Sequence, residues 1–110
     1  MKYAVIGSRS FNDYELFCAE MSKLKDCTAI ISGGARGADK FAEKWAEENK
    51  VPIEVVKPDW KQGQGAGLAR NRDIIDMCDC VIAFWDCESR GTKSAIDYAY
   101  SKNKAVKIIC

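Results

Sequence analysis

The stretch that decides the fold reads Thr28-Ala29-Ile30-Ile31-Ser32-Gly33-Gly34-Ala35-Arg36-Gly37-Ala38-Asp39. Its apolar beginning is typical of a strand, and Asp39 lies near the start of an amphipathic helical pattern. In the turn between them, glycines let backbone N–H groups approach an anion closely, and the helix start adds its partial positive charge. We therefore predict a strand, an anion-binding turn and a helix, although a tight turn without any ligand fits the same residues.

Further apolar runs of strand length lie near residues 3–6, 53–56, 81–84 and 105–109. The first three of these runs also end at clusters of polar, glycine or aromatic residues, whereas the runs begin after ordinary turn residues. Apolar residues at helical spacing separate the runs, and Asn12 or Asp13 can cap the first of the expected helices.

Alternating strands and helices indicate βαβ units. We expect a single Rossmann-like α/β domain over residues 1–110, with about five mostly parallel strands and helices on both faces. Right-handed crossovers predict the strand order 3-2-1-4-5. The polar clusters then converge on one edge of the sheet, and ligands bind such sheets at the switch point, here between the first and fourth strands.

The composition narrows the class of partner. The chain has 17 Lys and Arg residues against 16 Asp and Glu, a net charge of +1, whereas proteins that bind DNA through its backbone usually carry a marked basic excess. We therefore expect one small anionic ligand and not a nucleic acid. No apolar run approaches the ~20 residues needed to span a bilayer, and without a secretory signal a cytoplasmic location follows. With six cysteines and no histidine, we expect no metal site and no cofactor.

A second helix start follows the fourth strand, at Ser89-Arg90-Gly91-Thr92. We expect Thr92 to be its N-cap, with free backbone N–H groups available to a second anionic group or a ribose. Simple capping without a ligand is the alternative interpretation.

Aromatic and amide side chains complete the candidate site. Trp60 and Trp85 each lie beside an aspartate after a strand, and offer an aromatic face for a base unless they pack at the sheet edge. Arg70 and Asn71 can bind a ligand or form a solvated basic turn. We expect ligand contacts from Gly7, Ser8, Arg9, Ser32, Gly33, Gly34, Ala35, Arg36, Gly37, Asp39, Asp59, Trp60, Arg70, Asn71, Trp85, Asp86, Ser89, Gly91 and Thr92.

These clusters, in this order, resemble the SLOG superfamily, named for the Smf/DprA DNA-processing proteins and the LOG cytokinin-activating enzymes, and within it the small YspA/YpsA-related branch. The resemblance covers essentially the whole chain. It implies a Rossmann-like fold and a site for nucleotides or nucleotide-derived molecules. Several members of the branch are associated with phage or anti-phage conflict, and the resemblance also allows a homo-oligomer. It rests on Gly7-Ser8-Arg9, Ser32 to Asp39, Pro58-Asp59-Trp60, Ala66-Gly67, Arg70-Asn71, Ile82 to Asp86, and Ser89 with Gly91-Thr92.

The chain departs from the LOG-type phosphoribohydrolases at their catalytic run. Ala95 stands where those enzymes carry a glutamate, and Glu88-Ser89-Arg90 precedes Gly91 where they have a glycine pair. Because the carboxylate that assists cleavage of the N-glycosidic bond is missing, we do not expect that activity. Cys87 stands where the branch more often has glycine, and its side chain can reshape the pocket.

We interpret the chain as a protein that senses or sequesters a nucleotide-derived small molecule, such as a cyclic ADP-ribose-like or cyclic nucleotide immune signal. Without histidine, the commonest general base is absent. The alternative is a nucleotide-processing hydrolase, an N-glycosidase or phosphohydrolase, that uses Asp59, Asp86 or Glu88 as acid or base. A DNA-handling module akin to DprA fits the near-neutral charge less well. The identity of the ligand, its fate and the oligomeric state stay open at this point.

Overall fold

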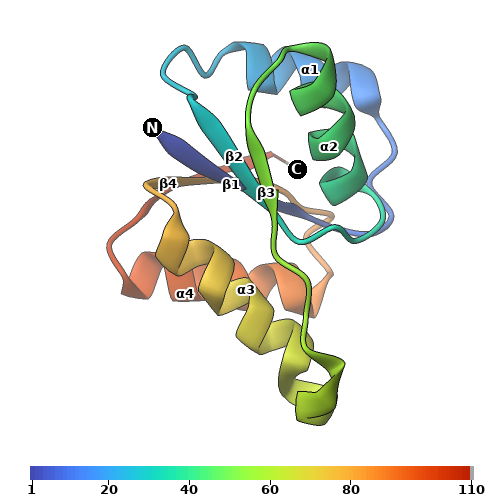
Figure 1. Cartoon of the computed structure of the whole chain (residues 1–110), viewed down its shortest axis with the longest axis vertical. Coiled ribbons are helices and arrows are strands. Elements are labelled where there is room, and N and C mark those ends of the chain that lie inside the picture. Colours follow the sequence, from blue (N-terminus) through green and yellow to red (C-terminus); the bar gives the residue numbers. More distant parts are fainter. Residues whose placement is uncertain (110) are drawn as a thin grey trace.

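A computed structural model describes residues 1–109, except for the side chains of Trp60, Gln62 and Gln64. Strands and helices alternate along the chain as expected (Figure 1). Their bounds are β1 Lys2–Gly7, α1 Tyr14–Ser22, β2 Ala29–Ser32, α2 Ala38–Glu48, β3 Ile53–Val55, a 3-10 helix η1 Trp60–Gly65, α3 Ala66–Met77, β4 Cys80–Phe84, α4 Arg90–Ser101 and β5 Ala105–Ile109.

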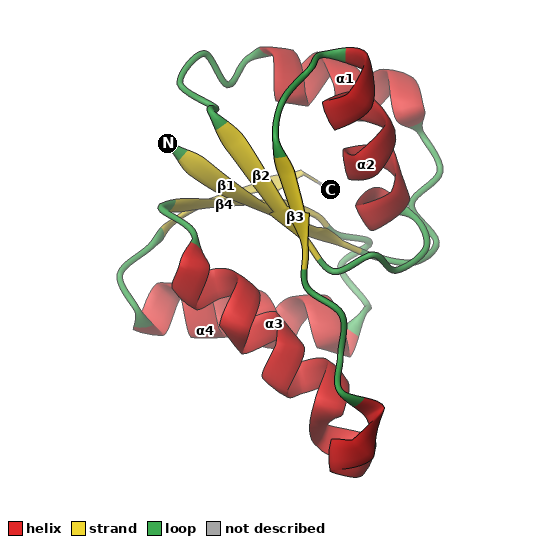
Figure 2. Cartoon of the chain, in the orientation of Figure 1, coloured by secondary structure: helices red, strands yellow, loops and turns green. Residues whose placement is uncertain are grey.

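The five strands form one parallel sheet in the order β3-β2-β1-β4-β5. In the centre, β1 pairs with β4 from Tyr3 and Cys80 to Gly7 and Phe84. Helices α1 and α2 cover one face of the sheet, and α3 and α4 cover the other (Figure 2). The predicted α/β class, strand order and two-sided helical cover are therefore confirmed.

The core has two halves, one on each face of the sheet, because successive side chains of a strand point to opposite sides. Val5 packs with the residues under α1 and α2, where the rings of Phe17 and Phe84 stack with their centroids 4.6 Å apart. Ala4 and Ile6 pack on the opposite face, under α3 and α4. The central strands β1, β2 and β4 are thus buried on both sides, as is typical of parallel sheets, whereas the edge strands β3 and β5 are partly exposed.

One local prediction about the helices needs correction. The helix after β4 begins at Arg90 with Ser89 in the N-cap position, so the prediction that Thr92 caps it is wrong. The physical reason is that Asp86 accepts hydrogen bonds from the N–H groups of Glu88 and Ser89, which turns the chain into the helix earlier. Between β3 and α3, the chain forms η1, which projects beyond the start of α3 (Figure 1).

The start of α1 agrees with prediction. Asp13 is its N-cap, and the carboxylate accepts a hydrogen bond from the N–H of Leu16 at 3.0 Å. This bond satisfies one of the N–H groups that the first turn of a helix leaves without a partner. Within residues 1–109, no helix has the length and apolar character needed to cross a bilayer.

The ends of the central strands are held together by close backbone contacts. The N–H of Ser8 donates to the carbonyl of Phe84 at 2.9 Å, and the N–H of Val56 donates to that of Ser32 at 2.8 Å. These bonds extend the strand pairing beyond the sheet. They bring the segments that follow β1, β2 and β4 to one edge, as predicted.

We predict that Gly37→Ala destabilises the fold by about 1–3 kcal/mol. Gly37 has φ +74°, and a Cβ atom there would collide with the carbonyl oxygen of Ser8 and lie 2.8 Å from that of Arg9. Urea unfolding measures the effect. Gly67→Ala is the matched control, because nothing lies within 4 Å of a Cβ at that position of α3, so we expect a gain of up to about 1 kcal/mol. Equal stability of the two variants would contradict the prediction.

Candidate functional site

A pocket of about 380 Å³ opens at the carboxyl edge of the sheet, beyond the end of β1. Its wall combines the end of β1, the loop before α2, one face of α3 and the first turns of α4. The lining residues are Ile6, Gly7, Ser8, Arg9, Ala35, Asp39, Gly67, Leu68, Arg70, Asn71, Ile74, Ser89, Gly91, Thr92 and Ala95. The location is the switch point at which open α/β sheets bind ligands.

Two guanidinium groups form the positively charged side of the pocket. Arg9 is exposed, whereas Arg70 is half-buried. Arg70 is held in place, since its Nη1 donates to the carbonyl of Gly33 at 2.7 Å and its Nε donates to Oδ1 of Asn71 at 2.8 Å. Burial lowers the pKa of Arg70; the charge of Asp39 opposes this shift, and that of Arg9 adds to it. Arginine nevertheless stays protonated in proteins, so the pocket contains a fixed cation with N–H groups to spare.

Asp39 is the buried carboxyl group of the pocket, with 8% of its surface exposed. Its Oδ2 accepts a hydrogen bond from the N–H of Ala35 at 3.1 Å. Burial raises the pKa of Asp39, and this hydrogen bond and the charge of Arg70 oppose the shift. The nearby hydroxyl of Ser32 also lowers the pKa of Asp39. This hydroxyl is fully buried and forms no hydrogen bond among the described residues. A carboxyl of this kind can take up a proton near a bound anion.

Asp86 joins the loop after β4 to the loop after β1. Its Oδ1 accepts from the N–H groups of Ser89 at 2.7 Å and Glu88 at 2.9 Å, and its Oδ2 accepts from the hydroxyl of Ser89 at 2.9 Å. Its own N–H donates to Oγ of Ser8 at 3.0 Å. The hydrogen bonds from Ser89 and Glu88 hold the pKa of Asp86 well below its usual range. Asp86 therefore shapes the pocket from outside, as a carboxylate that is ionised at neutral pH.

The side chain of Ser89 does not cap α4, because it is directed toward Asp86 and Ser8. Its Oγ contacts Asp86 and Oγ of Ser8, and α4 has no side-chain cap. Among the described residues, the N–H groups of Arg90, Gly91 and Thr92 have no hydrogen-bond acceptor. An uncapped helix start beside a cationic wall favours a negatively charged group.

The structure brings ten of the predicted site residues into the pocket and leaves others around it. Lining the pocket are Gly7, Ser8, Arg9, Ala35, Asp39, Arg70, Asn71, Ser89, Gly91 and Thr92. Absent from the lining are Ser32, Gly33, Gly34, Arg36, Gly37, Asp59, Trp85 and Asp86. The side chain of Trp60 lies outside the described residues.

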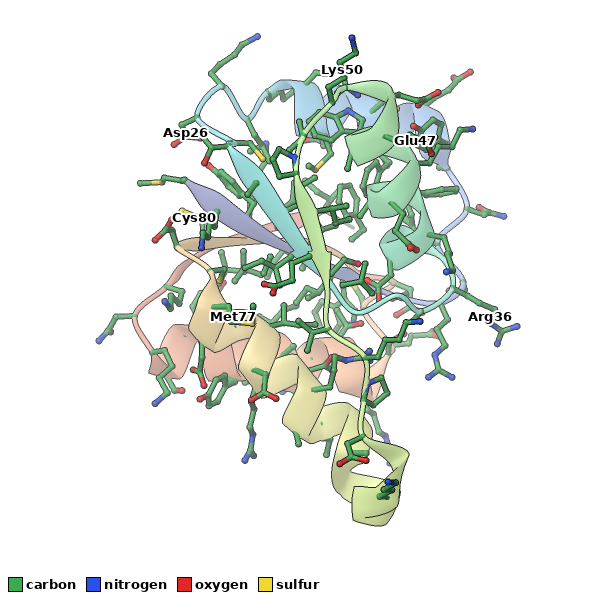
Figure 3. The ribbon with its side chains drawn as sticks, in the orientation of Figure 1. Asp26, Arg36, Glu47, Lys50, Met77 and Cys80 are labelled. Atoms are coloured by element: carbon green, nitrogen blue, oxygen red, sulfur yellow. The ribbon has the colours of Figure 1, made fainter. Side chains whose placement is uncertain are left out.

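The residues that miss the pocket have other contacts. Arg36 is exposed and points away from the molecule (Figure 3). Trp85 packs against the core under α3 and α4, and its indole N–H donates to the carbonyl of Ser89 at 3.0 Å. Asp59 caps η1, where it accepts from the N–H of Lys61 at 3.1 Å. A charged or aromatic residue that follows a strand therefore does not necessarily line the pocket.

Sequence reasoning missed the apolar part of the pocket. Ile6, Leu68 and Ile74 line it, and Leu68 is 47% exposed although it is a large apolar residue. The signal was the spacing of Leu68, Asn71 and Ile74, which places the three on one face of a helix. Ala95 also lines the pocket, at 3% exposure. Among the described residues, no group of three or more Cys, Asp or Glu is placed to hold a metal ion.

Comparison with known proteins finds both a family and a fold. A family model described as the YspA, cpYpsA-related SLOG family matches residues 1–63. Gene 61 protein of Mycobacterium phage D29 is 31% identical over 100 residues, which cover 81% of this chain and 80% of that protein.

Two solved structures of DNA processing protein A (DprA) share the fold. DprA from Streptococcus pneumoniae superposes with a TM-score of 0.82 at 22% identity, over 99% of this chain and 50% of that one. DprA from Helicobacter pylori, which binds single-stranded DNA, superposes with a TM-score of 0.76 at 24% identity, over 98% of this chain and 64% of that one. The chain thus spans about half to two thirds of the DprA chains, and at these identities the likeness shows the fold alone.

We predict that Asp86→Asn lowers stability at pH 7 and that this difference shrinks in acid. The folded-state pKa of Asp86 lies below its ordinary value of 3.8, so its carboxylate stabilises the fold above that pH and loses this contribution as the pH falls. Urea midpoints at pH 7 and below pH 3.8 measure the difference. Asp73→Asn, an exposed carboxylate on α3, is the control for the change in charge. A difference that stays constant with pH would show that the carboxylate has no such role.

Proposed function

The chain belongs to the YspA, cpYpsA-related SLOG family, and from this premise we propose that it binds a nucleotide-derived small molecule in the pocket beyond β1. The observation that carries the proposal is the convergence of Arg9, Arg70 and the uncapped start of α4 on one partly apolar pocket. A phosphate group fits the charged side, because a guanidinium and helix N–H groups both donate to phosphate oxygens.

The remaining wall suits the uncharged part of a nucleotide. Leu68, Ile74 and Ala95 offer apolar surface to a base or the carbon face of a ribose. The amide of Asn71 and the carboxyl of Asp39 provide polar contacts for hydroxyl or amine groups. A phosphate bound nearby raises the pKa of Asp39 further, which favours the protonated form that can itself donate a hydrogen bond.

We propose binding, and so sensing or sequestration, in preference to catalysis. Ala95 offers no acid or base in the pocket, and Asp86 is held ionised by its hydrogen bonds. Neither Asp59 nor Glu88 lines the pocket. The alternative function, a nucleotide-processing hydrolase, would therefore need Asp39 as its acid or base.

The relative in phage D29 supports a finer proposal about context. We propose that the ligand is a signal in the conflict between phages and their hosts, such as a cyclic ADP-ribose-like or cyclic nucleotide molecule. The anionic and aromatic character of such molecules matches a pocket with both cations and apolar wall.

Single-stranded nucleic acid is the second candidate partner. It is favoured by the fold shared with H. pylori DprA, which binds single-stranded DNA, and by the cations at the pocket mouth. The net charge of +1 weighs against it, because backbone contacts to a polymer need several uncompensated cations. An affinity for oligonucleotides that falls steeply with salt would favour this candidate.

We predict that Arg9→Ala weakens binding of a phosphorylated ligand by about 1.5–3 kcal/mol, roughly a 10- to 150-fold rise in Kd, because it removes a charge-assisted hydrogen bond. Calorimetric titration with nucleoside monophosphates, ADP-ribose and cyclic dinucleotides measures the loss. Arg36→Ala is the matched control, since it removes an exposed guanidinium outside the pocket. Equal losses in the two variants would place the phosphate elsewhere.

We predict that the same nucleotides are recovered intact after prolonged incubation with the protein. No residue other than Asp39 is placed in the pocket as a carboxyl acid or base among the described residues. Chromatography against a protein-free sample detects any product. Turnover that disappears in Asp39→Asn would replace the binding proposal with the hydrolase.

A further inference from the structure

A second hollow of about 460 Å³ lies between α3 and α4, next to the pocket. Arg72 of α3 lines it together with Arg90, Lys93 and Ser94 of α4, and with Asp97 and Tyr98. Figure 2 shows the two helices side by side on one face of the sheet. The hollow thus belongs to the same helix pair as the pocket but has a separate lining.

The hollow carries uncompensated positive charge. Lys93 pairs with Asp97 at 2.9 Å, which accounts for the single carboxylate in the lining. Arg72 lies over the ring of Tyr98, 5.6 Å from its centroid. Across the described part of the chain, neither Arg72 nor Arg90 forms an ion pair. The two guanidinium groups therefore keep their capacity to bind an anion in a forked geometry.

The placement of these cations runs against the electrostatics of the helix. Arg90 and Lys93 occupy the first turn of α4, which contains no acidic residue. The start of a helix carries partial positive charge and favours anions, so cations there repel the helix dipole. A sequence that breaks this rule without a local compensation points to a functional site. A bound anion between Arg90 and Lys93 would supply that compensation.

The hollow and the pocket adjoin at two points of the backbone. In α3, Asn71 lines the pocket and its neighbour Arg72 lines the hollow. In α4, Gly91 lines the pocket and its neighbour Arg90 lines the hollow. A ligand with one phosphate at Arg9 and Arg70 can therefore extend past the middle of α3 and the start of α4 to a second group of cations. The two cavities are separate, so a second phosphate there must be spaced from the first.

We propose that Arg72, Arg90 and Lys93 form a second phosphate subsite, and that the ligand carries two phosphate groups separated by a nucleoside, as in a linear dinucleotide. This inference rests on the proposed function of the pocket. It narrows the class of ligand to a dinucleotide, because a mononucleotide would leave the hollow empty and a cyclic ADP-ribose-like molecule has its two phosphates joined directly. The same phosphate chemistry occurs in a single strand of nucleic acid, and the experiment separates the two sources.

The test compares AMP with the 5′-phosphorylated dinucleotide pApA, using the folded full chain and calorimetry. We expect wild type to bind pApA about tenfold more tightly than AMP or better, since the second phosphate gains charge-assisted hydrogen bonds. The double variant Arg72→Ala/Arg90→Ala should lose this advantage while it binds AMP within about twofold of wild type. Lys25→Ala/Arg36→Ala removes two exposed cations elsewhere and should change neither affinity.

The outcomes separate the two proposals. Equal binding of AMP and pApA by wild type, or equal losses for both ligands in the double variant, overturns the second subsite and leaves the pocket in place. Failure of wild type to bind either ligand overturns the proposed function and the subsite together. If a twelve-residue oligothymidylate binds far more tightly than pApA, with a steep dependence on salt, the hollow accommodates a strand and the dinucleotide assignment is overturned.

A second measurement is independent of any ligand. Because Arg90 opposes the dipole of α4 and forms no ion pair with the residues that the structure describes, Arg90→Ala should leave the urea midpoint equal to or above that of wild type. The variant therefore folds, and loss of pApA binding reports on the subsite. A lower midpoint would show that Arg90 supports the fold and would overturn its assignment to the ligand.

Discussion

The parallel pairing of β1 with β4 is the constraint on which the rest of the molecule depends. It places the carboxyl ends of two strands that lie far apart in the sequence next to each other, and the N–H of Ser8 extends it by bonding to Phe84. Asp86 then ties the two following loops together through Ser8 and Ser89. Because these hydrogen bonds engage the hydroxyl of Ser89, the start of α4 stays uncapped and open to a ligand. The pocket is thus a consequence of how the centre of the sheet is closed.

The charges around the pocket have separate tasks. Asp86 is exposed and ionised at neutral pH, because backbone N–H groups bind its oxygens and lower its pKa. Asp39 is buried, and desolvation raises its pKa despite the nearby charge of Arg70. One carboxyl therefore organises the loops, whereas on our proposal the protonation of the other depends on what the pocket binds. Arg9 is accessible to a ligand, since its side chain is exposed and forms no ion pair within the described residues.

The two halves of the chain contribute differently to the site. The family model covers residues 1–63, which include β1, the glycine-rich turn and the start of α2. The remaining wall comes from α3 and α4, with Arg70 and Thr92 on the polar side and Leu68 on the apolar side. The second hollow is built from these two helices alone. On our proposal, residues 1–63 supply the edge of the sheet that binds an anion. Helices α3 and α4 then determine which ligand the protein binds.

The alternation of apolar runs and helical patterns was enough to determine the α/β class, the strand order and the edge that carries the site, because periodicity and right-handed crossovers are local properties of the chain. It also placed Arg9, Asp39 and Arg70, which line the pocket, among the candidate residues. The sequence could not assign the N-cap of α4, since that depends on the capture of Ser89 by Asp86 and Ser8. Nor could it tell that Arg36 points to solvent while Arg70 reaches back to Gly33. Only the tertiary structure decided which of several similar side chains face the pocket, because that choice follows from the packing of α3 against the sheet and from hydrogen bonds between residues far apart in the sequence.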